Sequence, residues 1–587
     1  MAQVAVDIHQ DKIQKLVTII LDGEEVQVPE EVTILEACRM KEIHIPTLCY
    51  MEGLSPYGGC RICVVEVKGQ PNLAASCVTP VRSGMEVLTT SKEVREARRA
   101  NLELLLSNHP LDCQLCDRNQ ACELQTLAYV FGTREIRFQG EKLHHDVDLS
   151  SPSVKRDLNR CILCGRCIRT CSEIQTVFAI DFANRGFESY VSPSLGLPLG
   201  ESVCINCGQC IHACPTGALT EVEHVERVWE AIDDPEKIVI LQTAPAIRVS
   251  IGEPFGIPPG SISTGKMVAG FRRLGFDKVF DTNFAADLTI IEEGTEFISR
   301  LKTGGKLPLI TSCSPGWIKF MEHFYPDLVE NVSTCKSPQQ MFGALAKTYY
   351  AQKIGVEAKD IVVTSIMPCT AKKYECQRDE MQASGYQDVN YTLTTREAAR
   401  MLREKGIDLR EMPEENFDDP LGISSGAAAV FGATGGVMEA ALRSVYELLT
   451  GDALPKLDFM DVRGMEGVKE ALVDMKGTLV RVAVAHGLGN ARKLMDLVRS
   501  GEVEYHFIEV MACPGGCIGG GGQPIPTNLA IRMKRIEAIY NVDRGLAIRK
   551  SHENPAIKTL YDEFLGEPNG EKAHHLLHTH YTCREKM

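Results

Sequence analysis

The sequence predicts a multidomain protein in which small cysteine-rich α+β modules precede a larger α/β domain. The chain has 587 residues, enough for about four domains. Fifteen of its 23 cysteines lie in tight groups before residue 215, and beyond about residue 238 short apolar runs alternate with helical ones. We place the domains at 1–94, 95–140, 150–222, 225–530 and 531–587.

Composition narrows the class of protein. The chain is 44% hydrophobic and 24% charged, which is typical of a globular protein. Its net charge of −15 argues against a nucleic-acid-binding surface. No apolar run is long enough to span a bilayer, and the first residues, MAQVAVDIHQDKIQ, lack the features of a signal peptide. We therefore expect a soluble, cytoplasmic protein.

The first cysteine group follows a predicted β-hairpin and helix. The run KLVTIILDGEEVQV should turn at Asp22-Gly23, and Thr33–Met40 should form a helix with Thr33 and Glu36 as its capping box. This order suggests a ferredoxin-like domain of the ubiquitin-roll type. Four thiolates suit a [2Fe–2S] cluster, although their spacing is not the plant-type one and structural zinc is the alternative. The residues are Cys49, Cys60, Cys63 and Cys77.

The second group combines one histidine with three cysteines: His109, Cys113, Cys116 and Cys122. Such a set could hold zinc, and a lone histidine is often no ligand. Because the group lies between two iron–sulfur candidates, we expect a His-ligated [4Fe–4S] cluster. Replacing a thiolate by imidazole should raise the potential of that cluster.

The third group repeats a C-x2-C-x2-C-x3-C pattern, which is typical of bacterial ferredoxins with two [4Fe–4S] clusters. In that arrangement the fourth cysteine of each run serves the other cluster. One set is then Cys161, Cys164, Cys167 and Cys214, and the other is Cys204, Cys207, Cys210 and Cys171. Four clusters in series would carry single electrons, so the N-terminal third is predicted to be an electron-transfer relay.

The C-terminal half reads as an α/β domain with largely parallel sheets. Its β-rich runs are IVILQTAPAIRVSIG, DKVFDTNFAADLTIIEE, KLPLITSC and DIVVTSIMPC, and its helical runs include GKMVAGFRRLGF and SPQQMFGALAKTYYAQKIG. Cys313 and Cys369 follow strand-like runs, where such folds place their sites. Cys513 and Cys517 lie in a glycine-rich segment, in which glycines should let backbone crowd a bulky inorganic group. The segment lacks the order of a phosphate-binding loop.

Three segments of this half, TSCSPGW (Thr311–Trp317), MPCTAKKYE (Met367–Glu375) and EVMACPGGC (Glu509–Cys517), resemble the signature motifs of [FeFe]-hydrogenases. The resemblance extends over essentially the whole chain, including a small-subunit-like tail after about Ala530. The first third also resembles a subunit of respiratory complex I. The resemblance implies an α/β domain that holds an H-cluster, a [4Fe–4S] unit joined to a two-iron unit with CO, cyanide and a bridging dithiolate.

The resemblance also implies roles for single residues. Cys369, Cys513 and Cys517 would ligate the H-cluster, Lys372 would hold a cyanide by a charge-assisted hydrogen bond, and Met511 would pack beside the two-iron unit. Where many family members have two adjacent cysteines, this sequence has Cys313-Ser314. Strict register makes Ser314 a ligand and Cys313 a proton relay. The alternative is that Cys313 is the ligand and Ser314 the relay, because serine is a poor ligand for iron.

The family's proton relay maps onto Cys313, Glu293, Ser333, Glu296 and Arg300. Glu293 and Glu296 are three residues apart and would share one face of a helix, although a solvated acidic face gives the same pattern. Cys38 is predicted to be a core residue, and Cys335, Cys376 and Cys583 receive no role. The histidine run at His574–His580 is read as the end of a C-terminal helix rather than a metal-binding tract.

The sequence therefore predicts an iron-only hydrogenase subunit for the reversible reaction H2 ⇌ 2H⁺ + 2e⁻. No dinucleotide-binding or flavin motif is found, so an NAD(P)- and flavin-binding partner subunit, ferredoxin, or both should exchange its electrons. A hetero-oligomeric, NAD(P)-linked complex is expected, and electron bifurcation is one form it could take. The alternatives are a self-sufficient ferredoxin-dependent hydrogenase, an electron-transfer subunit with an inactive site, and an H2 sensor, for which no signalling module is evident.

Overall fold

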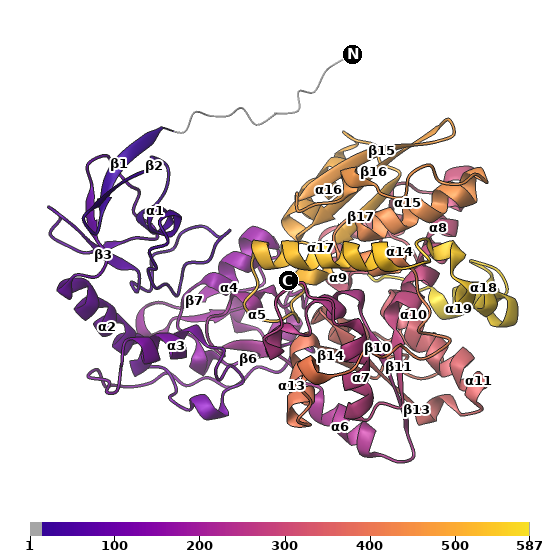
Figure 1. Cartoon of the computed structure of the whole chain (residues 1–587), viewed down its shortest axis with the longest axis horizontal. Helices are drawn as coiled ribbons and strands as arrows, with labels where there is room; N and C mark the ends of the chain where they lie inside the picture. Colours follow the sequence, from indigo (N-terminus) through magenta and orange to yellow (C-terminus); the bar gives the residue numbers. More distant parts are fainter. Residues whose placement is uncertain (1–14, 586–587) are drawn as a thin grey trace.

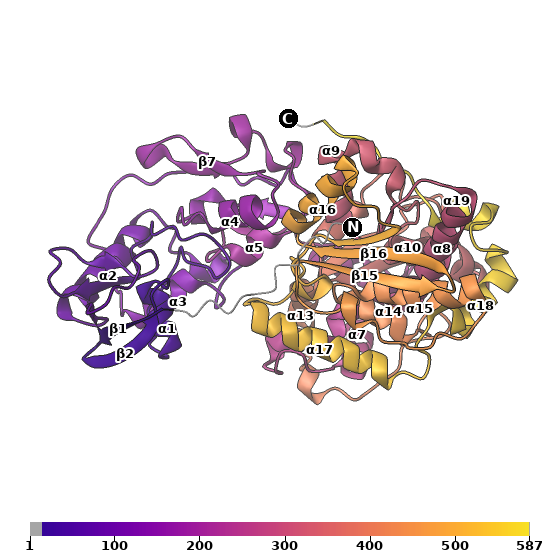
Figure 2. The same cartoon turned by 90° about the horizontal axis from the view of Figure 1, so that it is seen from above.

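The computed structural model describes residues 15–585. The cysteine-rich N-terminal modules lie at one end of the long axis and the larger domain at the other, in both views (Figures 1 and 2). The expected absence of a targeting signal concerns residues 1–14, which lie outside the described part. Within residues 15–585, no helix combines the length and the apolarity needed to cross a bilayer.

A five-stranded sheet of order β2-β1-β5-β3-β4 forms the first module. Its elements are β1 (Leu16–Leu21), β2 (Glu24–Pro29), α1 (Ile34–Met40), β3 (Val64–Val67), β4 (Ala74–Ala75) and β5 (Glu86–Leu88). The predicted hairpin is confirmed: β1 and β2 are antiparallel, and Asp22 and Gly23 have φ of 49° and 92°, as a tight two-residue turn requires. The capping box of Thr33 and Glu36 on α1 is also confirmed, and Cys38 is fully buried.

The cysteine-rich segment that follows has little regular structure. Its elements are α2 (Lys92–Ser107), α3 (Glu123–Val130), β6 (Val154–Arg156), α4 (Arg166–Arg169), β7 (Asp181–Ala183), β8 (Tyr190–Ser192), α5 (Gln209–Ala213) and β9 (Leu219–Glu221). The proposed domain border at residue 94 falls inside α2. Arg169 donates to the backbone oxygen of Cys49 at 2.6 Å, and Arg166 forms a 2.7 Å ion pair with Glu123. These buried arginines fix the modules against one another.

Two four-stranded sheets build the large domain, with orders β11-β10-β13-β14 and β12-β17-β16-β15. All pairs are parallel except the β15–β16 hairpin, so the predicted α/β class with largely parallel sheets is confirmed. The strands are β10 (Ile238–Thr243), β11 (Lys278–Asp281), β12 (Leu309–Ile310), β13 (Ile361–Met367), β14 (Tyr391–Thr394), β15 (Val468–Met475), β16 (Thr478–His486) and β17 (Phe507–Met511).

Helices cover and separate the two sheets. They are α6 (Val225–Asp233), α7 (Thr264–Leu274), α8 (Thr282–Thr303), α9 (Pro315–Phe324), α10 (Pro338–Leu345), α11 (Ala351–Ile354), α12 (Ala371–Glu375), α13 (Thr395–Glu404), α14 (Gly426–Ala429), α15 (Gly436–Thr450) and α16 (Leu488–Ser500). Both helical runs predicted from sequence are found, in α7 and in α10 with α11.

The prediction of a β-rich run over residues 277–293 is wrong beyond Asp281, where α8 begins. On one side α8 joins the core of the second sheet through Ile290, and on the other it joins the core of the first sheet through Leu288. A helix buried on both sides shows no polar face, so its sequence resembles that of a buried strand. The run KLPLITSC contains only the two-residue strand β12.

The C-terminal segment wraps around the large domain. Its helices are α17 (Leu529–Gly545), α18 (Pro555–Leu560) and α19 (Glu571–Leu577). Figure 1 shows α17 lying across the domain, and Ile539 and Leu560 enter two of its hydrophobic cores. The prediction of a helix end within the histidine run is confirmed, because α19 contains His574 and ends just before His578.

Candidate active site

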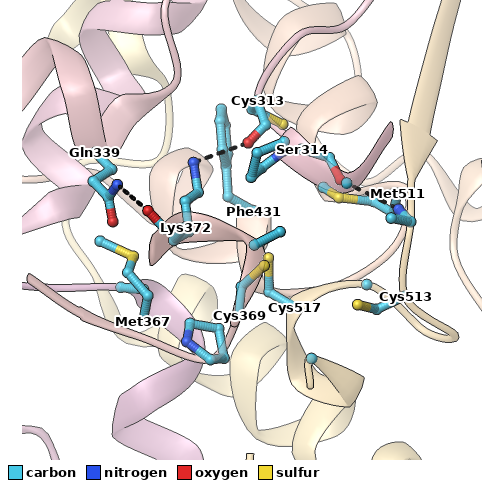
Figure 3. Close-up of a pocket in the computed structure, with 18 of the residues that line it drawn as sticks. Cys313, Ser314, Gln339, Met367, Cys369, Lys372, Phe431, Met511, Cys513 and Cys517 are labelled. Atoms are coloured by element: carbon cyan, nitrogen blue, oxygen red, sulfur yellow. Dashed lines mark hydrogen bonds between the residues drawn. The ribbon is translucent and has the colours of Figure 1, made fainter. Parts of the chain in front are cut away.

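Strands of both sheets end around one buried cavity of about 80 Å³. The segments that follow β10, β12, β13 and β17 line it, together with α8. The carboxyl ends of parallel strands are where α/β folds place their sites. Figure 3 shows that the lining side chains come from all three motif segments singled out in the sequence. Most of the lining is apolar, and Lys372 is its one ammonium group among the described residues.

Three cysteines of the motifs, Cys369, Cys513 and Cys517, line this cavity (Figure 3). Burial raises the pKa of each thiol, to about 12 for Cys517, where the nearby Cys369 adds to the rise. A buried thiolate needs a cation beside it, and a metal ion supplies one. Converging thiols in an apolar pocket therefore have the donor chemistry of an iron–sulfur site.

Lys372 is held in a fixed position at the edge of the cavity. Its Nζ atom donates to Glu375 Oε2 at 2.9 Å. It also donates to the backbone oxygen of Cys313 at 3.1 Å, as Figure 3 shows. Burial alone would lower the pKa of Lys372, but the charge of Glu375 raises it, so the ammonium stays protonated. The site thus keeps a positive charge in a dry environment, which suits an anionic ligand.

Cys313 and Ser314 lie between β12 and α9, and both line the cavity. Burial raises the pKa of the Cys313 thiol well above its usual value, and the nearby Glu293 raises it further. Ser314 Oγ accepts a 3.3 Å hydrogen bond from the backbone nitrogen of Ala512. Cys313 therefore lines the cavity near the buried carboxyl of Glu293, whereas Ser314 contacts the segment that carries Cys513.

The glycine-rich segment after β17 packs against protein backbone. A Cβ atom on Gly520 would lie 2.1 Å from the backbone oxygen of Pro368, and one on Gly521 would lie 2.2 Å from that of Cys207. The sequence predicted that these glycines let the backbone approach an inorganic group. At these two positions the backbone instead approaches the protein segments that carry Cys369 and Cys207. His212 also contacts the oxygen of Gly520 at 2.7 Å, which joins the ferredoxin-like segment to the cavity wall.

The residues of the expected proton relay lie close together on α8, in the segment after β12 and in the segment between α9 and α10. Glu293 is 2% exposed, so the alternative of a solvated acidic face is wrong for it. Burial and the charge of Glu296 raise the pKa of Glu293 to about 8. Ser333 Oγ donates to Glu296 Oε2 at 2.9 Å, and Arg300 pairs with Glu296 Oε1 at 2.5 Å. The group runs from Cys313, which lines the cavity, to Arg300, whose side chain is 15% exposed.

Two smaller cavities lie within the ferredoxin-like segment. The first, of about 30 Å³, is lined by Cys171 together with Cys204, Cys207 and Cys210. The second, of about 20 Å³, is lined by Cys214 together with Cys161, Cys164 and Cys167. Each run thus meets the fourth cysteine of the other. Cys207 also lines the large cavity, so the two sites are neighbours.

The first two cysteine groups also gather in space, to different degrees. In the first, Cys63 and Cys77 have sulfur atoms 3.3 Å apart, and Cys49 interacts with both Cys60 and Cys77. The second lies around α3: Cys113 begins a short 3₁₀ turn, Cys122 caps α3, and Cys116 is close enough to affect the pKa of Cys122.

His109, the fourth member of the second group, is 8% exposed, and burial lowers its pKa to about 4. Its Nδ1 atom is buried and has no hydrogen-bond partner within residues 15–585. A neutral imidazole with an unpaired nitrogen suits a metal ligand.

Sequence reasoning missed the residues that support Lys372. Glu375 Oε2 accepts hydrogen bonds from Lys372, from Ser337 at 2.9 Å and from Gln339 Nε2 at 3.1 Å. The i,i+3 spacing of Lys372 and Glu375 in the second motif could have indicated this pair. No comparable signal marks Gln339 or Phe431, which reach the cavity from other parts of the chain.

Comparison with protein families accounts for nearly the whole described chain. Residues 237–521 match the family described as "Iron only hydrogenase large subunit, C-terminal domain", and residues 529–584 match "Iron hydrogenase small subunit". Residues 14–92 match a "2Fe-2S iron-sulfur cluster binding domain". Residues 98–137 match "NADH-ubiquinone oxidoreductase-G iron-sulfur binding region", and residues 151–220 match "NADH-quinone oxidoreductase subunit 3, ferredoxin-like domain".

Individual relatives are similar over most of their length. The NADP-reducing hydrogenase subunit HndD of Solidesulfovibrio fructosivorans is 53% identical over 584 residues, which cover 97% of this chain and 100% of that protein. Iron hydrogenase 1 of Clostridium pasteurianum is 40% identical over 571 residues, 96% of this chain and 99% of that one. Among solved structures, an apo [FeFe]-hydrogenase of Chlamydomonas reinhardtii is 47% identical with a TM-score of 0.56, covering 62% of this chain and 99% of that chain.

Proposed function

The chain belongs to the iron-only [FeFe]-hydrogenase family, and from this premise we propose how its residues carry out the family's reaction. That reaction is the reversible interconversion of H2 with two protons and two electrons. The observation that carries the proposal is the apolar cavity where the cysteines of three separate motifs, a buried ammonium and a buried carboxyl meet.

We assign the H-cluster to this cavity. When bound, the H-cluster supplies two-electron chemistry on H2, which amino-acid side chains cannot perform. Cys369, Cys513 and Cys517 are the proposed ligands, and Ser314 stands at the fourth position. The Lys372 ammonium, oriented by Glu375, would donate a charge-assisted hydrogen bond to a cyanide, and Met511 would fill space beside it. The apolar lining excludes water.

Cys313, Glu293, Ser333, Glu296 and Arg300 form the proposed proton route. We give Cys313 this role rather than ligation on the register of the motif, and the nearby charge of Glu293, which helps to raise the pKa of its thiol, supports the choice. The raised pKa of Glu293 lets a buried carboxyl hold a proton near neutral pH and pass it on. Ser333 links this carboxyl to Glu296, and Arg300 holds Glu296 near the surface.

Electrons would travel through four clusters. The proposed set is a [2Fe–2S] cluster on Cys49, Cys60, Cys63 and Cys77, a [4Fe–4S] cluster on His109, Cys113, Cys116 and Cys122, and two [4Fe–4S] clusters on the paired runs. The support is the shared position of Cys207 in two neighbouring cavities and the neutral, unpaired imidazole of His109.

We further propose that an NAD(P)-binding partner subunit in the cytoplasm exchanges electrons with this chain. The similar subunit of S. fructosivorans is named NADP-reducing, and the N-terminal third matches families named for NADH oxidoreductases. The sequence itself carries no dinucleotide-binding fingerprint. The same proposal includes ferredoxin or a flavin-containing subunit as a partner that exchanges electrons with this chain.

The matured, isolated chain tests this assignment. It should evolve H2 from an artificial one-electron donor yet fail to reduce NAD(P) until its partner is added. Reduction of NAD(P) by the pure chain would contradict the partner claim. Infrared bands of metal-bound CO and cyanide should be present; their absence would favour an electron-transfer subunit with an inactive site, the alternative raised by Ser314.

A further inference from the structure

Three residues with metal-ligating side chains meet outside the cavity. One ligand atom from each of Glu296, Cys335 and His578 lies within 4.8 Å of the other two. Cys335 and His578 are fully or almost fully buried, and Glu296 is partly buried. They come from α8, from the segment between α9 and α10 and from the C-terminal segment, so only the folded chain assembles them.

Backbone pairing holds the C-terminal segment in place at this cluster. Cys335 and His578 face each other in an antiparallel bridge. The backbone nitrogens of Lys336 and Thr579 each donate a 2.7 Å hydrogen bond across it, to Leu577 and Thr334 respectively. The thiol and the imidazole are therefore brought together by regular hydrogen bonding rather than by a chance contact of long side chains.

Groups around the cluster already orient its ligand atoms. His578 Nε2 lies 3.1 Å from the buried Glu292 carboxylate, while His578 Nδ1 lies 2.7 Å from Thr334 Oγ1 on the Glu296 side. A carboxylate on one ring nitrogen is the usual way to orient an imidazole that binds metal through the other. At His578 the metal would replace the Thr334 hydroxyl on Nδ1. Arg300 pairs with Glu296 Oε1, while Glu296 Oε2 accepts hydrogen bonds from Ser333 Oγ at 2.9 Å and from the backbone nitrogen of Thr334 at 3.2 Å, so the carboxylate is held in place beside Cys335 and His578.

We propose that Glu296, Cys335 and His578 form a binding site for a divalent metal ion of intermediate softness, with Zn²⁺ as the best match. One sulfur, one nitrogen and one carboxylate oxygen are Zn²⁺ ligands, and water can complete a tetrahedral shell. Binding takes the thiolate of Cys335 and releases its proton, so the ligands Cys335 and Glu296 together neutralise the ion. The carboxylate of Glu292, which lies 3.1 Å from His578 Nε2, adds negative charge beside it.

The site has a consequence for turnover that rests on the proposed function. Glu296 is a member of the proton route, and a carboxylate bound to Zn²⁺ cannot carry protons. The side chains of Glu296 and Arg300 are 12% and 15% exposed, which gives an ion an approach from solvent. Zn²⁺ should therefore inhibit H2 evolution reversibly, and a chelator should restore it.

The test measures metal binding separately from activity. The holoenzyme is dialysed against Zn²⁺ and analysed for zinc and iron, and the zinc absorption edge is recorded. We expect one zinc per chain with unchanged iron, bound by one sulfur at about 2.3 Å and by nitrogen or oxygen atoms at about 2.0 to 2.2 Å. Cys335→Ser and His578→Gln should lose this zinc and resist inhibition, whereas Glu292→Gln should weaken binding about 10- to 100-fold.

Two control variants make the result specific. His574→Gln changes the ring stacked on His578, with centroids 4.6 Å apart, and should behave as wild type. His552→Gln removes the imidazole of the partly buried group of Glu447, His552 and Glu553 and should also leave the zinc in place. No zinc uptake, a shell without sulfur, or wild-type uptake by both Cys335→Ser and His578→Gln would overturn the site. Full zinc occupancy without inhibition would instead contradict the relay role of Glu296.

Discussion

The carboxyl group of Glu293 is buried, has a raised pKa and has one oxygen atom without a hydrogen-bond partner among the described residues. Its Oε1 atom is buried and has no hydrogen-bond partner in the described part of the chain, and burial with the charge of Glu296 raises its pKa to about 8. A structural carboxyl of this burial would normally have all its bonds made. A buried carboxyl group that has an unpaired oxygen and is protonated near neutral pH is suited to passing protons between neighbouring groups.

Replacing Glu293 by Gln should therefore slow H2 evolution about 100- to 10,000-fold, because the amide keeps the shape but cannot exchange protons. The cluster content should not change, since the side chain lies outside the proposed ligands. Wild-type H2 evolution should fall as pH rises through about 8, where the carboxyl loses its proton, and this step should vanish in the variant. Steady-state rates across pH with iron analysis check this, and lost iron would contradict the relay role.

Matched substitutions can show which of Cys313 and Ser314 is the cluster ligand and which is the proton relay. Cys313→Ala should abolish turnover but leave the electron paramagnetic resonance signal of the cubane intact, because the proposed role of Cys313 is in proton transfer. Ser314→Cys, the matched variant, should keep the cubane and keep activity, since it places a softer ligand at the fourth position. If the cubane signal disappears in Cys313→Ala, Cys313 is a ligand and the two roles are exchanged.

At the scale of helices, strands and loops, prediction succeeded where the signal is local. The Asp22-Gly23 turn and the capping box on α1 depend on neighbouring residues, and the cysteine spacings mark their groups directly. Prediction failed at α8, whose burial between two sheets removes the polar face that identifies a helix. It also could not pair Cys335 with His578, because tertiary packing alone brings residues so far apart in sequence together.

The loop after β17 offers a test of close backbone packing. Gly520→Ala should destabilise the chain by about 1–3 kcal/mol and lower both H-cluster content and activity, because its Cβ atom would lie 2.1 Å from the Pro368 oxygen beside Cys369. Gly545→Ala, at the end of α17, is the control: its Cβ meets nothing within 4 Å. Thermal unfolding and iron content measure both variants. Equal behaviour of the two would show that the loop can shift without loss.

At the scale of the whole molecule, the cysteine groups lie along the path from the large domain to the first module. The cavity of the paired runs shares Cys207 with the large cavity, and Arg169 joins the ferredoxin-like segment to the backbone of Cys49. Because single electrons pass between neighbouring clusters, this chain of contacts fits one continuous route with the His109 group as a side branch or an intermediate. The two possibilities differ in what loss of that group does to electron exchange with a partner.

His109→Ala should reduce NAD(P)-linked turnover with the partner subunit more strongly than it reduces H2 evolution from an artificial donor. The reason is that the clusters of the paired runs, adjacent to the cavity, can still take electrons from a small donor, whereas a partner docked on the N-terminal modules depends on the outer clusters. His109→Cys restores a ligand but adds negative charge, so it should keep the cluster and lower its potential. The exposed His144 provides a control, His144→Ala, with no expected change.

Paired assays with both donors and a redox titration measure these effects. Equal losses in the two assays would place the His109 group on the only route to the active site, and no loss in either would remove it from electron transfer altogether.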